Sequence, residues 1–504
     1  MEYEVVIGME THIELDTDSK MFCACDARFF GAEPNTHVCP VCLGMPGAMP
    51  VINKRAVEFT IMVGLALNCS IARHTFWERK SYWYPDLPKG YQISQYQRPL
   101  CYDGWIDVDV RDVASGVWQE QAERRRIRIR RAHLEEDTGK LTHAGAYSYV
   151  DYNRSGVPLI EIVTEPDIRS ADEAYAYLSA LQQIVRYLGV SSADMEKGAM
   201  RCEPNMSLRP KGSQDFGVKV EIKNLNSLRA VRDAIAYEIE RQTRILRAGG
   251  TIKQVTLGWD EARGVTVVQR EKESAHDYRY FPEPDLPPLE ISEAWLEAIR
   301  ARMPELALSR QDRYRRDYGL SAYDASVLTA ERAVADWFES ALAAFAADDG
   351  RLAQRAKTVA NWVQTEVFRL MKANGLSPSQ INDIKVRPAQ LADLLRLVEQ
   401  GTINNNTAKF VLEDMFATGA NAAEIVQAKG LAQMSDVEAL RQIVNQVIAA
   451  NPQQVAQVRA GQEKVFGFLV GQAMKATKGK GNAQIINQLL REAIAAADDL
   501  PAQG

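Results

Sequence analysis

The feature that most constrains the fold is a change of residue pattern near residue 290. Before this point the chain is rich in Tyr, Val, Ile, Arg and Gly, and apolar and polar residues alternate in short segments. Beyond it the chain is rich in Ala, Leu and Gln, with apolar residues at helical spacing. A period of two is typical of strands, and a period near 3.6 is typical of amphipathic helices. The sequence therefore predicts an α+β part followed by an all-α part.

Acidic residues recur on one face of three alternating segments in the α+β part. Side chains alternate across a strand, so residues two apart in the sequence share a face. The residues that share a face are Glu10, His12 and Glu14 in the first segment, Arg201, Glu203 and Asn205 in the second, and Glu221 and Lys223 in the third. If these strands are neighbours in one sheet, oxygen ligands for Mg²⁺ and cations for phosphate converge. The sequence then predicts a magnesium–nucleotide site, with a solvated strand face as the alternative for Gly8–Leu15.

Four of the seven cysteines form a pattern typical of a metal site. Cys23 and Cys25 make a CxC, and Cys39 and Cys42 make a CxxC; thirteen residues separate the two pairs. In a reducing compartment this spacing indicates one tetrahedral Zn²⁺ held by four thiolates, with unpaired thiols as the alternative. Such a closed site is structural because it leaves no open position for a substrate. We expect the remaining three cysteines in the core: Cys69, Cys101 and Cys202.

One strand of the α+β part is predicted to have a basic outer face. Arg126, Arg128 and Arg130 alternate with Ile127 and Ile129, which indicates a half-buried strand. The arginines either serve a binding surface or neutralise carboxylates on neighbouring strands.

Two segments are rich in aromatic residues and prolines: the first is predicted to be an ordered loop that runs into a short strand, and the second a rigid, extended segment. The first, Tyr82–Gln95, contains two prolines and a glycine among its aromatics, which excludes a regular element. It either fills a core or lines a cleft, and the neighbouring cations Lys80 and Lys89 favour the cleft. The second, Asp277–Pro288, either wraps over the sheet or forms part of the same cleft.

Helical spacing predicts several helices. In the first part these are Ile52–Leu67 and a helix from Ser170 to Leu188 with Ser170 as N-cap; in the second part they are Leu320–Phe345 and Arg351–Lys372. The polar run Ile403–Thr407 indicates a second boundary, followed by a small helical module. Within that module Lys475–Asn482 is a basic loop between two helices, either solvated or suited to an RNA backbone.

Composition excludes several classes of protein. The net charge of −6 argues against a surface covered with charge for non-specific polyanion binding. No apolar run reaches the roughly 18–20 residues of a membrane span, and the acidic N-terminus leads us to expect no signal peptide. We therefore expect a cytoplasmic enzyme or enzyme subunit of roughly two to four domains. The sequence has no Walker, Rossmann or GxSxG motif and no recognisable apparatus for generating ammonia.

These motifs together resemble one known family. The resemblance is carried, in order along nearly the whole chain, by Gly8–Leu15, the CxC and CxxC pairs, Tyr82–Gln95, His133–Lys140, Asp151–Glu161, Glu221–Ser227, Asp277–Pro288 and Val465–Lys480. The run Asp151-Tyr-Asn-Arg-Ser-Gly-Val-Pro-Leu-Ile-Glu161 is the most specific of them. The chain resembles the B subunit of the bacterial tRNA-dependent amidotransferases, which make Gln-tRNA(Gln) and Asn-tRNA(Asn) from misacylated precursors.

The resemblance implies three domains and a reaction. The domains are a cradle with a mostly antiparallel sheet over 1–291, a helical domain over 292–405 and a tRNA-binding helical tail over 406–504. ATP and Mg²⁺ would serve to phosphorylate the side-chain carboxylate of Glu-tRNA(Gln) or Asp-tRNA(Asn). Ammonia released from glutamine by the A subunit (the glutaminase) would then displace the phosphate, while the C subunit clasps the other two. The cognate non-discriminating synthetase is a further candidate partner.

The resemblance also implies roles for individual residues. Catalytic and Mg²⁺ roles fall on Glu10, His12, Glu136, Glu203 and Glu221. Nucleotide contacts fall on Glu10, His12, Glu135, Glu136, Arg201, Asn205 and Lys223, and the sequence does not separate Glu135 from Glu136. Lys80 and Lys89 would line an ammonia tunnel, and Zn²⁺ would bind the four clustered cysteines. Lys475, Lys478 and Lys480 would contact tRNA.

The chain departs from the family pattern in the second acidic strand. The family commonly has Arg-Cys-Asp-Ala-Asn where this chain has Arg201-Cys202-Glu203-Pro204-Asn205. An acid is kept, but Pro204 cannot donate to a strand ladder, which predicts an edge strand or a bulge. The alternative to an enzyme is a non-catalytic, zinc-stabilised tRNA-binding scaffold. Clustered carboxylates favour the enzyme, because acids repel RNA phosphate unless a metal intervenes.

Overall fold

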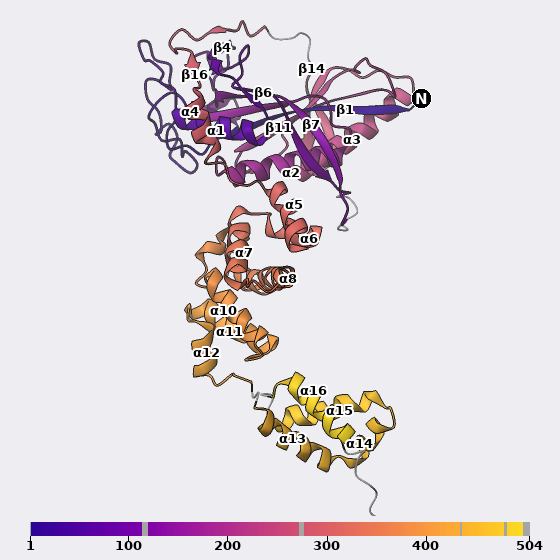
Figure 1. Ribbon diagram of the computed structural model, residues 1–504. Coiled ribbons are helices and arrows are strands. Elements are labelled where there is room, and N and C mark those ends of the chain that lie inside the picture. The colour runs from indigo at the N-terminus through magenta and orange to yellow at the C-terminus, as the bar shows by residue number, and fades with distance from the viewer. Residues whose placement is uncertain (1, 113–118, 272–276, 434–435, 478–480, 497–504) are drawn as a thin grey trace, which may run out of the picture. The chain divides into compact units, whose positions relative to one another are not determined.

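The computed structural model describes residues 2–112, 119–271, 277–433, 436–477 and 481–496 (Figure 1). The chain divides into two compact units, Met1–Arg310 and Gln311–Gly504. The first is built on a mixed sheet and the second is helical. This confirms the predicted fold class of an α+β part followed by an all-α part.

The first unit is organised around a nine-stranded sheet. Its strands are, in spatial order, β14 (Val265–Glu271), β13 (Val255–Asp260), β12 (Val220–Lys223), β11 (Met200–Pro210), β1 (Tyr3–Glu14), β10 (Pro158–Thr164), β7 (Glu123–Glu136), β6 (Cys101–Val110) and β2 (Ser70–Ile71). Neighbouring strands are antiparallel except for β12 and β13, which run parallel. The expected mostly antiparallel sheet is confirmed, with the first strand of the chain near its centre.

Helices cover one face of this sheet and create the core there. They are α1 (Lys54–Ala66), α2 (Ala171–Leu188) and α3 (Leu228–Arg247), and α4 (Glu293–Arg300) packs against α1 (Figure 1). Ile7, Met9 and Ile13 of β1 join the hydrophobic cluster with residues of these helices. Ser170 caps α2 as predicted, accepting a hydrogen bond from the Glu173 amide at 3.0 Å. Because odd-numbered residues of β1 face this core, its even-numbered residues face away from it.

Short strands and loops flank the large sheet. They form three small sheets: β15 (Phe281–Pro282), β4 (Glu78–Ser81) and β5 (Tyr91–Ser94); β16 (Leu289–Glu290) and β3 (His74–Thr75); and β8 (Lys140–Ala144) with β9 (Tyr147–Asp151). The predicted aromatic loop follows β4 and runs into a short strand, β5, as expected. Phe281 of β15 pairs with Arg79 of β4.

Pro204 lies in neither an edge strand nor a bulge, contrary to the prediction. Strand β11 lies between β1 and β12, and its register with β1 runs unbroken past Pro204, which stands opposite Met9. The missing N–H is tolerated for a different reason. The paired residues of β11 and β12 are Asn205 and Met206 with Glu221 and Val220, so that ladder stops one residue short of the proline.

The second unit contains helices with two hydrophobic clusters. Its helices are α5 (Ala307–Tyr318, which crosses the unit boundary), α6 (Ala322–Leu328), α7 (Arg332–Phe345), α8 (Leu352–Trp362), the π-helical turn η1 (Val363–Val367), α9 (Phe368–Ala373), the 3-10 turn η2 (Pro378–Asp383), α10 (Pro388–Glu399), α11 (Asn405–Thr418), α12 (Ala422–Ala428), α13 (Val437–Ala450), α14 (Pro452–Arg459), α15 (Glu463–Ala476) and α16 (Ala483–Ala496). One cluster spans α5 to α12 and the other joins α13 to α16.

The predicted helix Leu320–Phe345 is interrupted. Helix α6 ends at Leu328, where the Thr329 hydroxyl donates to the Ala325 carbonyl at 2.7 Å, and α7 begins at Arg332. The division into three domains at 291 and 405 stays a prediction. Among the described residues, no helix combines the length and apolar character of a membrane span.

Candidate active site

The polar face of the central strands forms a cavity of about 850 Å³. The cavity is lined by nine of the residues singled out from the sequence: Glu10, His12, Lys80, Glu135, Arg201, Glu203, Asn205, Glu221 and Lys223. Convergence of the acid-bearing strands, assumed from the sequence, is therefore observed. It arises because β1, β11 and β12 are consecutive in the sheet.

Strand register builds the centre of the cavity as a row across the sheet. His12 stands opposite Arg201 of β11 on one side and Glu161 of β10 on the other. Glu161 in turn stands opposite His133 of β7. One step along the strands, Glu10 stands opposite Glu203. Imidazole, carboxylate and guanidinium groups therefore alternate across this face of the sheet, from β7 to β11.

Two imidazoles and two carboxylates form a cluster of possible metal ligands. The Nε2 atom of His12 lies 3.5 Å from Glu161 Oε2 and 3.7 Å from Glu135 Oε1. The Nε2 atom of His133 lies 3.7 Å from both Glu135 Oε2 and Glu161 Oε2. Ligands bound at about 2.1 Å to one octahedral ion stand about 3 Å apart, so a small inward movement would let these atoms share a cation. Glu10, His12 and Glu161 also bring their ligand atoms within 4.8 Å of one another.

The ionisation of these groups reflects their mutual charges. Burial alone would lower the pKa of His12, but the hydrogen bond and charge of Glu161 outweigh it and raise that pKa to about 9. Burial would raise the pKa of Glu161, yet the charges of His133 and His12 hold it well below its usual range. For Glu10, burial and the nearby Glu161 charge raise the pKa. The site thus keeps charged groups inside a largely buried space, which favours binding of ions.

Cations stand around the carboxylates. The Lys223 ammonium lies 2.7 Å from Glu203 Oε2 and 3.4 Å from Glu221 Oε1. The Lys80 ammonium lies over the rings of Tyr278 and Tyr82, at 5.1 and 5.8 Å from their centres. Burial would lower the pKa of Lys80, but the charge of Glu135, together with Glu161 and the neighbouring tyrosines, outweighs burial and raises that pKa. These ammonium groups are suited to neutralise phosphate oxygens.

Glu14 has a different environment from the other acids of β1. Burial and the neighbouring Asp137 raise its pKa to about 9. The guanidinium of Arg201 bonds Asp137 at 2.6 Å, and this charge holds the pKa of Asp137 below its usual range despite burial. Asp137, and not Glu14, lines the large cavity.

Glu136 does not lie with the predicted magnesium ligands. It follows Glu135 in β7, so its side chain points to the other face. There its carboxylate lies 2.7 Å from the Lys89 ammonium and accepts the Ile93 amide at 3.0 Å. This pair lines a separate cavity of about 210 Å³ beside Cys23 and Cys42. The structure thus separates the two acids, with Glu135 at the large cavity and Glu136 paired with Lys89.

Among the cavity residues that were not predicted as site residues, three belong to the charged network described above: His133, Asp137 and Glu161. Asp137 and His133 lie in a segment that was recognised only as a family motif. Glu161 had a signal of its own, because it is the single charged residue in the apolar strand Pro158–Thr164. A lone acid in a buried strand requires a partner, and here the partners are His12 and His133.

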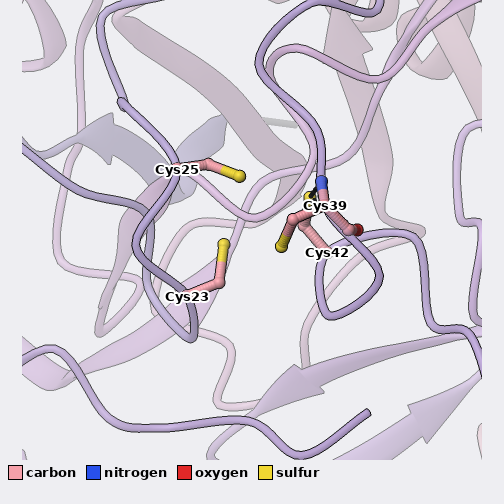
Figure 2. Close-up of side chains that lie close together, drawn as sticks. All are labelled: Cys23, Cys25, Cys39 and Cys42. Carbon is pink, nitrogen blue, oxygen red and sulfur yellow. Dashed lines mark hydrogen bonds between the residues drawn. The ribbon is translucent and has the colours of Figure 1, made fainter.

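The four clustered cysteines converge as their spacing predicts. Their sulfur atoms all lie within 4.8 Å of one another (Figure 2). The Cys42 sulfur accepts the Cys39 amide at 3.1 Å and lies 3.8 Å from the buried Lys20 ammonium. This donor set fits a tetrahedral Zn²⁺, whose four thiolates carry excess negative charge that Lys20 would offset. The other three cysteines are buried as expected: Cys69, Cys101 and Cys202.

The basic face of β7 is neutralised by its neighbours. Arg126 forms a two-point ion pair with Asp107 of β6, at 2.7 and 2.8 Å. Arg128 and Arg130 pair in the same manner with Asp167 and Glu165. These ion pairs agree with the second of the two predicted roles, in which the arginines neutralise nearby carboxylates.

Only part of the predicted basic loop can be described. Lys475 lies exposed in the last turn of α15. Lys478 and Lys480 lie outside the described residues.

Comparison with known proteins identifies the family. The family pattern described as the GatB/GatE catalytic domain matches residues 5–297, and the GatB domain matches residues 336–494. Proteins named as the B subunit of aspartyl/glutamyl-tRNA(Asn/Gln) amidotransferase are similar over 98% of this chain. That of Moorella thermoacetica is 53% identical over 496 residues and all of its own length. That of Caldicellulosiruptor saccharolyticus is 51% identical over 494 residues and 99% of its length. The chain therefore belongs to the family of aspartyl/glutamyl-tRNA(Asn/Gln) amidotransferase B subunits.

Proposed function

We propose that this protein activates and amidates the side-chain carboxylate of Glu-tRNA(Gln) or Asp-tRNA(Asn) at the 850 Å³ cavity. It would act as the B subunit of a glutamine-dependent ligase, with ammonia supplied by the A subunit and with the C subunit as a further partner. The observation that carries this proposal is the alternation of carboxylates, imidazoles and cations across one sheet face. A site of this composition suits a metal-bound triphosphate better than it suits bare RNA.

The chemistry requires two substitutions. An oxygen of the side-chain carboxylate attacks the γ-phosphorus of ATP, the bond from phosphorus to the β,γ-bridging oxygen breaks, and ADP leaves. The nitrogen of ammonia then attacks the carbonyl carbon of the acyl phosphate. The carbon–oxygen bond to phosphate breaks, the phosphate takes up the proton that nitrogen loses, and the amide is formed. Neither step needs a protein nucleophile, so positioning and charge neutralisation are what the chain must provide.

The described residues offer both positioning and charge neutralisation. When bound, Mg²⁺ would neutralise triphosphate charge and orient the γ-phosphoryl group. The ligand candidates are Glu10, His12 and Glu161, together with Glu135 and His133. Lys80, Arg201 and Lys223 line the same cavity and would hold phosphate oxygens, each such contact being worth about 10²–10³ in rate where charge develops.

The ammonia route is proposed to pass from the small cavity to the large one. Lys89 and Glu136 line the small cavity, and Lys80 lines the large one. Gln92 lines the large cavity and donates to the Glu136 backbone carbonyl at 2.7 Å. A polar connection of this kind would pass a neutral, hydrogen-bonding molecule from one space to the other.

The test is nucleotide turnover that depends on misacylated tRNA, with ammonium ions supplied so that glutamine hydrolysis by the A subunit is not limiting. The double variant Glu10→Ala, His12→Ala should lose this turnover and keep its fold. A double variant that is as active as the natural chain would show that this cavity is not the activation site. A natural chain that binds tRNA but turns over no nucleotide with any partner would favour the scaffold alternative.

A further inference from the structure

The loop that carries the two cysteine pairs (residues 23–45, the cysteine knuckle) forms part of the wall of the small cavity of about 210 Å³. Cys23, Cys42 and Gly44 of the knuckle line this cavity together with Lys89 and Glu136, the buried ion pair of the proposed ammonia route. The thiols that are expected to bind a metal and the ion pair therefore surround one small space.

The second cysteine pair forms a tight turn that fixes the place of Gly44. The Cys39 amide donates to the Cys42 sulfur at 3.1 Å, and the Gly44 amide donates to the Val41 carbonyl at 2.9 Å. Figure 2 shows the sulfur atoms of the two cysteine pairs facing one another, all within 4.8 Å. A metal shared by the four thiolates would lock this turn against the first pair, and the position of Gly44 would then depend on closure of the knuckle.

The backbone of Gly44 lies directly against the side chain of Lys89. Gly44 has a φ of +66°, and a Cβ at this position would stand 2.3 Å from Lys89 Cγ and 3.1 Å from Lys89 Cα and Cβ. Because carbon atoms pack at about 3.5–4.0 Å, any side chain at Gly44 would push the Lys89 stem away by about 1 Å. The Lys89 side chain is only 8% exposed, so it has little free space to move into.

Such a movement would break the ion pair. The Lys89 ammonium contacts both carboxylate oxygens of Glu136, at 2.7 and 2.8 Å. The carboxylate itself is held in place, because it accepts the Ile93 amide at 3.0 Å. A displacement of about 1 Å would lengthen the contacts between Lys89 and Glu136 beyond the usual hydrogen-bond range of about 2.7–3.2 Å.

A buried lysine joins the knuckle to the turn Asp151–Gly156. The Lys20 ammonium donates to the carbonyls of His37 at 2.7 Å and Tyr152 at 3.3 Å, and it lies 3.8 Å from the Cys42 sulfur. At the end of this turn, a Cβ on Gly156 would stand 3.5 Å from the Cys42 Cβ and 3.9 Å from a carboxylate oxygen of Glu136. The knuckle, the turn and the ion pair are thus packed as one unit.

We propose that the cysteine knuckle positions Lys89 on Glu136 through the backbone of Gly44, and that amidation with glutamine therefore requires a closed knuckle. This proposal rests on the ammonia route proposed above. Gly44 does not line the large cavity, so its role is to position Lys89 and not to take part in the reaction. The large cavity must admit the aminoacyl end of tRNA from solution, and free ammonia can enter with it. Only the glutamine-dependent reaction should therefore depend on Gly44.

The test compares Gly44→Ala with Gly31→Ala, each in the full-length chain assembled with its partner subunits. Gly31 is a matched control in the same knuckle: its φ is +82°, so alanine meets similar backbone strain, but a Cβ there has no atom within 4 Å. Gly44→Ala should lower glutamine-dependent amidation by about tenfold to 10²-fold. It should leave ammonium-dependent amidation, glutamine hydrolysis by the A subunit and zinc content unchanged. Gly31→Ala should change none of the four.

A second measurement reads the position of Lys89 without any activity. Reductive methylation followed by mass spectrometry reports how accessible each lysine is. Lys89 should be protected in the natural chain and in Gly31→Ala, and it should become methylated in Gly44→Ala and after removal of zinc by a chelator. Lys211, whose side chain is 63% exposed, should be methylated in every sample and serves as the internal standard.

Three results would overturn the proposal. Equal loss of amidation with glutamine and with ammonium would show damage to the activation site. Protection of Lys89 in Gly44→Ala would show that the contact does not position it. Loss of zinc or of the A subunit from Gly44→Ala would assign the defect to the knuckle fold or to assembly.

Failure of the ammonia route itself is distinguishable. The double variant Lys89→Gln, Glu136→Gln removes both charges of the ion pair. If it kept full glutamine-dependent amidation below its melting temperature, the small cavity would not be the route, whatever the accessibility of Lys89 in Gly44→Ala. A natural assembly that amidates with neither nitrogen source would contradict the proposed function as a whole.

Discussion

Replacing two adjacent acids, Glu135 and Glu136, by glutamine should have opposite consequences. Glu136→Gln leaves the Lys89 ammonium buried without a counter-charge, since the two side chains are only 3% and 8% exposed. Removing one partner of a buried ion pair costs about 3–5 kcal/mol, which for a unit of this size lowers the melting temperature by about 10 °C. Glu135→Gln keeps an acceptor for the Ser94 hydroxyl, which donates to Glu135 at 3.0 Å. Glu161 still lies 3.5 Å from His12 and 3.7 Å from His133 to balance them, so the melting temperature should fall less than in Glu136→Gln.

Activity should show the reverse order. Glu135→Gln removes a charge from the proposed metal cluster and should lower tRNA-dependent nucleotide turnover by about 10²–10³. Glu136→Gln, measured well below its melting temperature with free ammonium supplied, should retain most of this turnover. The assays are thermal unfolding followed by circular dichroism and phosphate release with misacylated tRNA.

A double variant provides the control. If the cost of Glu136→Gln is the unpaired ammonium, then adding Lys89→Gln should restore several kcal/mol, because the two positions are coupled. The reasoning would be refuted if Glu136→Gln proved as stable as the natural chain, or if Glu135→Gln were the variant that unfolds early. Either result would mean that the Glu136 side chain, and not that of Glu135, faces the large cavity.

Three further predictions concern other parts of the chain. Cys39→Ser should release stoichiometric Zn²⁺ and lower the melting temperature, as measured by metal analysis and calorimetry; retention of full zinc content would exclude the four-thiolate site. Arg126→Ala should reduce stability by at most about 1 kcal/mol, because exposed ion pairs contribute little, and should leave tRNA affinity unchanged; a clear loss of tRNA binding would assign the arginine strand to the RNA surface. Neutralising Lys475, Lys478 and Lys480 should weaken tRNA binding and reduce the slope of log affinity against log salt by about one for each phosphate that is no longer neutralised, and an unchanged slope would leave that loop without a role in binding.

Residue patterns predicted much of the site because strand parity is a strong constraint. Each alternating segment fixed which side chains share a face, and Glu10, His12, Glu203 and Glu221 do share one. Cysteine spacing likewise predicted the four-thiolate cluster, since a CxC and a CxxC joined by a short loop can close on one point.

What the sequence could not supply was the order of strands. Glu161 became a site residue only when β10 paired with β1 and brought it opposite His12. The same limitation affected Glu135 and Glu136, whose facing depends on the register of β7 against β10. The prediction of an edge strand or a bulge at Pro204 was wrong because it considered β11 without its partner strand. The tolerance of Pro204 depends on where the partner strand β12 stops.

The central claim is that a side-chain carboxylate is phosphorylated before ammonia attacks it. Glu-tRNA(Gln) labelled with ¹⁸O in both oxygens of its side-chain carboxylate tests this most directly, with released phosphate analysed by mass spectrometry. Attack of the carboxylate on the γ-phosphorus, followed by cleavage of the carbon–oxygen bond, predicts one ¹⁸O atom in each phosphate released during amidation. Release of unlabelled phosphate alongside normal formation of Gln-tRNA(Gln) would contradict the account.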